Sequence, residues 1–177
     1  MKEKHVDLQV LQILVQATVD NKEDARGIQI RSMATNILKL FGRLTSQVTN
    51  NPSVWENYAD LMYAVEEGTT FLVVQTLQKA YRSAVQIKGW EKDMETCMST
   101  LNVCQKFIEN CLSLLSKEST KEHVQLANSA KLSIFAVVKQ VKNCYDSDIP
   151  LMINNKVDVL ELKVNELVSS ITSVSAA

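Results

Sequence analysis

Three cysteines recur at seven-residue intervals, and this is the pattern in the sequence that comes closest to a chemical site. Cys97, Cys104 and Cys111 would share one face of a helix, while Cys144 stands apart. Seven helical residues place neighbouring sulfurs ~10 Å apart, whereas zinc binds thiolates at ~2.3 Å from ligands usually two to four residues apart. We therefore interpret the three thiols as small apolar core residues, and we expect neither a metal site nor a cofactor.

The two histidines, His5 and His123, do not form a catalytic arrangement with other residues. His5 lies near the start of the chain, and His123 lies in the first turn of a predicted helix. Neither is accompanied by a pair of carboxylates that would suggest general acid–base chemistry. The four scattered glycines also cannot form a phosphate-binding loop. We expect a protein that is not an enzyme and has no catalytic residues.

Basic residues form two loose groups that could bind a partner. They are Lys79, Arg82, Lys88 and Lys92 in the first group, and Lys131, Lys139 and Lys142 in the second. Aromatic residues do not alternate with them as in proteins that bind single-stranded nucleic acid, and the net charge is −1, so we expect neither a nucleic acid nor a membrane partner. A solvated helix face is the favoured interpretation. The first group remains a candidate contact for an acidic partner peptide.

The composition indicates long helices joined by short turns. Hydrophobic residues make up 46% of the 177 residues, whereas the chain has four glycines and two prolines. A β-rich fold of this length would need more turn residues. The sequence shows no apolar run of the ~18 residues that span a bilayer, and no signal peptide. With reduced thiols, this favours a cytoplasmic location, with the nucleus as a second compartment.

Hydrophobic periodicity predicts seven helices. The first six cover about 6–20, 28–49, 54–67, 70–86, 90–116 and 119–145, and the seventh runs from about 150 to the end. Short connections between them favour antiparallel neighbours.

Turn and capping residues predict where several of these helices begin and end. Ser53-x-x-Glu56 and Ser119-x-x-Glu122 are typical of capping boxes, in which the serine and the glutamate each bind a free backbone amide. Gly68 fits the C-terminal cap of the third helix. Asp148 is the predicted N-cap of the seventh helix, with Pro150 in its first turn.

Two helices show long apolar stripes. The fifth has an inward set of Met94, Cys97, Leu101, Cys104, Ile108, Cys111 and Leu115, and the seventh has steps of three and four along Val157, Leu160, Val164, Leu167, Ile171 and Val174. We expect the seventh helix to pack as a cap on the preceding helices, with a coiled-coil surface as the alternative. The segment 169–175 is rich in serine, which favours fraying of the last turns.

The third and fourth helices show the pattern of a nested helical hairpin. Its positions are Trp55, Tyr58, Ala59 and Met62 on the first helix, and Val73, Leu77 and Ala80 on the second. A large residue can fill the gap between two helices where small residues let the backbones approach. This pattern resembles a tetratricopeptide repeat with departures: Ala59 stands in place of glycine, Val73 in place of alanine, the loop is longer, and no proline closes the unit. Any antiparallel helix pair is the alternative.

A wider resemblance covers about the first hundred residues. Four segments occur in the same order, at Asp7–Val15, Leu40–Asn50, Leu77–Tyr81 and Trp90–Asp93. Together they resemble the carboxy-terminal part of the tetratricopeptide repeat protein 27 family. The resemblance implies an excised segment of a longer, non-enzymatic adaptor. It also implies a link to Hsp90-associated assembly chaperones and to maturation of the U5 snRNP.

The expected fold is all-α, with antiparallel hairpins in a tetratricopeptide-like superhelical stack. A two-helix hairpin is expected over 1–50, a degenerate repeat over 53–87 and a three-helix carboxy-terminal cap over 90–177, all in one continuous helical domain. The expected function is protein–protein interaction. The alternative is a structural segment that caps an upstream repeat array and binds nothing. The partner, the binding face and the oligomeric state stay open.

Overall fold

A computed structural model shows that the part of the chain that it describes is mostly helical. It describes residues 36, 39, 51–65 and 68–176, and these residues contain no β-strand. The elements are α3 (Pro52–Val65), α4 (Phe71–Val85), α5 (Met94–Lys117), α6 (Lys121–Tyr145), the 3₁₀ turn η1 (Asp146–Asp148) and α7 (Leu151–Ser175). The predicted all-α class of packed helices is confirmed, while the superhelical course of the stack stays a prediction.

The hairpin predicted over 1–50 lies outside the described residues, apart from Asn36 and Lys39. Both are helical and exposed, as expected for the polar side of the predicted second helix. The chain forms two compact units, Met1–Ala80 and Tyr81–Ala177. The boundary falls within α4, and the expected division into three segments stays a prediction.

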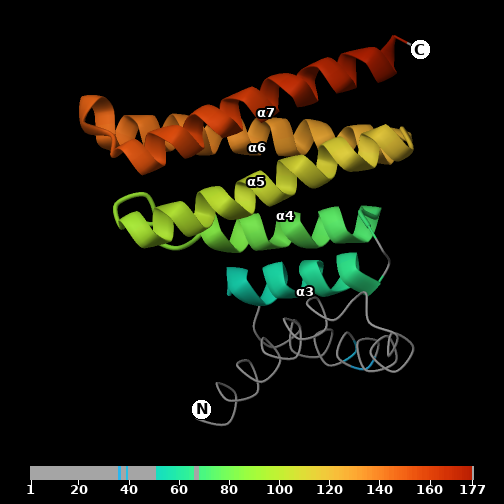
Figure 1. Cartoon of the computed structure of the whole chain (residues 1–177), viewed down its shortest axis with the longest axis horizontal. Coiled ribbons are helices and arrows are strands. Elements are labelled where there is room, and N and C mark those ends of the chain that lie inside the picture. Colours follow the sequence, from blue (N-terminus) through green and yellow to red (C-terminus); the bar gives the residue numbers. More distant parts are fainter. Residues whose placement is uncertain (1–35, 37–38, 40–50, 66–67, 177) are drawn as a thin grey trace. The chain divides into compact units, whose positions relative to one another are not determined.

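In the first unit, α3 and the first part of α4 lie side by side (Figure 1). Both helices turn an apolar stripe inward, because their apolar residues recur every three or four positions. The buried members are Val54, Trp55, Ala59, Leu61 and Met62 on α3, and Val73, Val74, Leu77 and Ala80 on α4. The amide of Gly68 donates to the carbonyl of Tyr63, which satisfies a free carbonyl where α3 ends.

In the second unit, α5, α6 and α7 form a bundle in which each helix packs against the other two (Figure 1). Short connections at 118–120 and 146–150 make successive helices antiparallel. Leu101, Phe107, Ile134, Ile153 and Leu160 are among the large side chains that the bundle buries completely. Burial of such side chains contributes ~1.5–3 kcal/mol each, so the three facing stripes supply most of this unit's stability.

Polar contacts fix the neighbouring elements of this unit. Tyr81, at the end of α4, donates its hydroxyl to the carbonyl of Ser133 on α6 at 3.4 Å. Its ring stacks on Phe107 of α5, with ring centroids 6.0 Å apart. Burial raises the pKa of the Tyr81 hydroxyl. Lys156 of α7 donates to the side-chain oxygen of Gln105 on α5 at 2.5 Å.

The apolar stripe of α7 packs inward, as predicted for a helix that caps its predecessors. Its stripe residues Val157, Leu160, Val164, Leu167 and Ile171 are buried, and Val174 is half-buried. They contact α5 and α6. These residues are therefore packed against other helices of the same chain, and the alternative of a coiled-coil surface on them is wrong.

Both predicted capping boxes are displaced in the structure. Asn51, not Ser53, caps α3: its side-chain oxygen accepts the amide of Ser53 at 3.0 Å, and Pro52 occupies the first helical position. Thr120, not Ser119, caps α6, because its hydroxyl accepts the amide of His123 at 3.2 Å. Ser119 instead donates its hydroxyl back to the carbonyl of Leu115.

The predicted start of the fifth helix at Trp90 is wrong by four residues. Trp90 lies in a series of turns after α4 and is buried there. The helix begins at Met94, where Asp93 accepts the amide of Thr96 at 2.9 Å. Met94 was expected to face inward but is 50% exposed. It is the first residue of α5, where neighbouring helices do not cover the side chain. Cys97 is the first buried member of the stripe.

The two ends of α7 also differ from the sequence prediction. Asp148 belongs to η1 and does not cap the helix; Pro150 precedes its first residue without a side-chain cap. At the other end the helix continues to Ser175 instead of fraying. Serine and threonine hydroxyls there donate to the carbonyls four residues back, and these donors are Ser169, Ser170, Thr172, Ser173 and Ser175.

Candidate protein-binding surface

The hairpin positions predicted from the repeat pattern gather between α3 and α4. Six of the seven are buried and Tyr58 is half-buried; the buried ones are Trp55, Ala59, Met62, Val73, Leu77 and Ala80. Lys79 holds its ammonium 4.9 Å from the centre of the Trp55 ring, a distance typical of a cation–π contact. This contact joins the two helices in a hairpin on which a binding surface could be built.

The four basic residues of the predicted contact group are all exposed. Lys79 and Arg82 lie three residues apart on α4, which places them on one side of that helix. Lys88 and Lys92 lie in the turns that follow α4, where the amide of Lys92 donates to the carbonyl of Gly89. No carboxylate of the described residues forms an ion pair with these four side chains. Their charges are therefore available to an acidic segment of another protein, although binding by them stays a prediction.

The cysteine stripe is buried where the core interpretation placed it. Cys97, Cys104 and Cys111 of α5 are almost fully buried, whereas Cys144 near the end of α6 is exposed. Burial raises the pKa of Cys97 to about 11 and those of Cys104 and Cys111 to about 12. The described residues contain no group of His, Cys, Asp and Glu able to hold a metal ion. These thiols are unreactive packing groups at neutral pH.

His123 serves the start of α6. Its backbone amide donates to the Thr120 hydroxyl, and its ring Nδ1 lies 2.6 Å from the carbonyl oxygen of Glu118. Both contacts are local to the turn between α5 and α6, so the geometry gives this imidazole a structural task.

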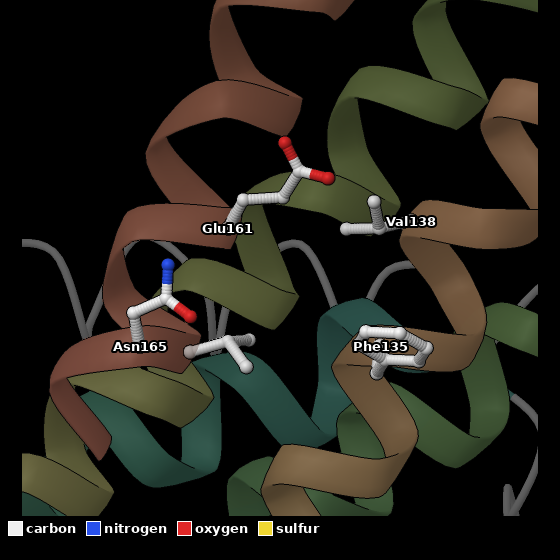
Figure 2. Close-up of a pocket in the computed structure, with 5 residues that line it drawn as sticks. Phe135, Val138, Glu161 and Asn165 are labelled. Carbon is white, nitrogen blue, oxygen red and sulfur yellow. The ribbon is translucent and has the colours of Figure 1, made fainter. Parts of the chain in front are cut away.

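A cleft of about 200 Å³ lies between α6 and α7, and sequence analysis did not identify it. Figure 2 shows Phe135 and Val138 of α6 facing Glu161 and Asn165 of α7, and Val164 also lines the cleft. The signal that could have found it is Phe135, a large apolar residue outside the buried stripe of its helix. Glu161 is the ionisable group in this lining and forms an ion pair with Lys142 at 2.5 Å, so the cleft lacks a catalytic set.

Comparison with known proteins gives one informative match. No family model matches the chain, and no solved structure matches it. The chain is 27% identical over 146 residues to the tetratricopeptide repeat protein 27 homolog of Dictyostelium discoideum. The chain resembles tetratricopeptide repeat protein 27. The match covers 82% of this chain, so it extends well beyond the hundred residues on which the sequence resemblance was based.

The resemblance to tetratricopeptide repeat protein 27 concerns a small part of that protein, since the matched region is 16% of the relative's length. The predicted resemblance to a segment of this family is confirmed, and it supports a helical module for protein–protein interaction. None of the described helices has the length and apolar character needed to cross a membrane.

Proposed function

We propose that this chain is the protein-binding segment of a non-enzymatic adaptor. The observation that supports the proposal is the hairpin of α3 and α4, joined by the contact of Lys79 with Trp55, in a chain similar to tetratricopeptide repeat protein 27 over 82% of its length. Stacked helical hairpins form rigid surfaces. Such a surface binds without large ordering of its own side chains, which lowers the entropy cost of association.

We further propose that its partners belong to Hsp90-associated assembly machinery or to the U5 snRNP, in the cytoplasm and in the nucleus. The exposed Lys79, Arg82, Lys88 and Lys92 would contact an acidic segment of such a partner. Exposed charges mainly accelerate association and select among partners. Binding should therefore weaken as the salt concentration rises.

The test is capture of these partners by the immobilised 177-residue chain, measured by quantitative mass spectrometry. The charge-reversed variant Arg82→Glu/Lys92→Glu should lose the captured partners. The control Lys117→Glu/Lys121→Glu makes the same change in net charge at the turn between α5 and α6 and should retain them. Equal capture by both variants, or enrichment of neither assembly chaperones nor U5 components over a helical reference protein, would contradict the proposal.

A purely structural cap is the second candidate function. It is favoured by the buried stripe of α7, which closes the bundle against α5 and α6. In that case the isolated chain would capture no partner. Deletion of the corresponding segment from the longer protein would instead lower the melting temperature of the remaining repeats.

A further inference from the structure

The face that α6 and α7 present away from α5 has several exposed apolar side chains. Leu132 and Phe135, one turn apart on α6, are 68% and 65% exposed, and Val168 on α7 is also exposed. Single exposed apolar residues are ordinary, but a group of them next to a cleft indicates a contact site.

Charged side chains border this face with opposite signs on its two helices. Lys139 and Lys142 lie on the α6 edge, one and two turns from Phe135, while Asp158 and Glu161 lie on the α7 edge. Lys142 and Glu161 pair with each other across the groove. Within the described part of the chain, Lys139 and Asp158 have no ion-pair partner. A complementary surface must therefore be acidic opposite α6 and basic opposite α7.

A second copy of the same face meets this requirement. A two-fold axis along the groove places α6 of each copy over α7 of the other, so each basic edge faces an acidic edge. The same rotation places Leu132 and Phe135 of α6 against α7 of the other copy, and Val168 of α7 against its α6. In such an isologous contact every interaction occurs twice.

The size of the face also favours a second copy over a single peptide helix. Two helices of 25 residues lying side by side present roughly 800 Å², given a rise of ~1.5 Å per residue and a width of ~10 Å per helix. Standard protein interfaces bury about 800 Å² on each partner. A single helix seated in the groove would leave the outer charges of both edges unpaired.

We propose that the α6–α7 face binds a second copy of this chain, forming an antiparallel four-helix contact between the two molecules. Phe135 lies at its centre, and Lys139 faces the acidic edge of the other copy.

The test is sedimentation equilibrium of the full chain under reducing conditions, which prevent the exposed Cys144 from forming a disulfide between molecules. From ~2 to ~200 μM, the average mass should rise from 19.9 kDa toward twice that value. Phe135→Asp should raise the dissociation constant at least ~10-fold. The control Leu72→Asp places the same charge at an exposed leucine of α4 and should leave the constant within about twofold. Circular dichroism verifies that both variants are folded.

Charge reversal distinguishes a second copy from any other occupant. Lys139→Glu and Asp158→Lys should each weaken self-association, because each creates two like-charge contacts in its own dimer. An equimolar mixture of the two variants should associate again, since every contact in the mixed dimer is complementary. A wild-type chain that stays monomeric over the whole range overturns the proposal, as does a dimer that Phe135→Asp leaves intact. Recovery of a monomer that binds a foreign amphipathic helix through Phe135 would assign the face to that helix and also overturn it.

Discussion

The four thiols differ in environment although their residue type is the same. Cys97, Cys104 and Cys111 lie on the inner side of α5, and Cys144 lies in the exposed last turn of α6. The seven-residue spacing was enough to predict that the first three share one buried face. It also predicted Met94 as buried, because periodicity does not show how far the neighbouring helices extend beside each turn.

Thiol labelling should therefore separate Cys144 from the other three. At neutral pH and without denaturant, a thiol reagent should modify one cysteine per chain quickly, since the others are buried and their raised pKa suppresses the reactive thiolate. Mass spectrometry of the labelled protein gives the count. Cys144→Ser should abolish the fast reaction, and denaturant should expose all the cysteines of the wild-type chain. Rapid labelling of more than one native thiol would contradict the buried placement.

At the scale of the helices, sequence patterns predicted inner faces better than ends. The α7 stripe from Val157 to Ile171 was predicted correctly, because each step of three or four residues returns to the side that α5 and α6 cover. Helix starts depend on which of two adjacent side chains has the backbone angles of a cap. Ser119 and Thr120 both have a hydroxyl, and the sequence alone favoured the wrong one.

Substitution of these two neighbours should have unequal effects. Thr120→Ala removes the acceptor of the His123 amide and should lower the free energy of unfolding by ~1 kcal/mol. Ser119→Ala removes a bond from an exposed hydroxyl to a helical carbonyl and should change it by less than ~0.5 kcal/mol. Urea denaturation followed by circular dichroism gives both values. A larger loss of unfolding free energy for Ser119→Ala than for Thr120→Ala would instead identify Ser119 as the cap.

Two leucines of α4 provide a similar comparison for the repeat hairpin. Leu77 is buried between the helices, whereas Leu72 is 50% exposed. Leu77→Ala should cost ~2–5 kcal/mol through lost burial and the resulting cavity, and Leu72→Ala should cost less than ~1 kcal/mol. Thermal melts with Trp55 fluorescence report on this unit, if Trp90 is first replaced by phenylalanine. Equal losses for both leucines would contradict the packing of α4.

At the scale of the whole molecule, the sequence predicted an all-helical chain and its resemblance to tetratricopeptide repeat protein 27. It did not predict the cleft at Phe135 or the apolar outer face of α6, since each depends on how α6 and α7 are placed side by side. The basic candidates Lys79 and Arg82 could be selected from sequence because charge requires no knowledge of packing. Their contact with a partner is a property of a complex, and no pattern within one chain defines it.

Burial of the α5 thiols also makes the stability of the fold depend on pH. Cys104 and Cys111 have folded pKa values of about 12, above the unfolded value of ~8.5. The contribution of these two thiols to the free energy of unfolding is fully present below pH ~8.5, and it is lost as the pH rises through their pKa values in the folded state. Urea denaturation from pH 7 to 11 should show falling stability above pH ~9. Cys104→Ala/Cys111→Ala should reduce that slope by ~1.4 kcal/mol per pH unit for each thiol, and an unchanged slope would contradict the assignment.

Asp146, the C-cap residue of α6, has a strained backbone conformation that lowers the stability of the fold. Asp146 has a φ of 49° and a ψ of −122°, a backbone conformation that costs residues with a β-carbon ~1–3 kcal/mol. Glycine would enter this bend without that penalty. The packing of α6 and α7 therefore holds Asp146 in this strained conformation. Asp146→Gly should remove the strain and raise the melting temperature.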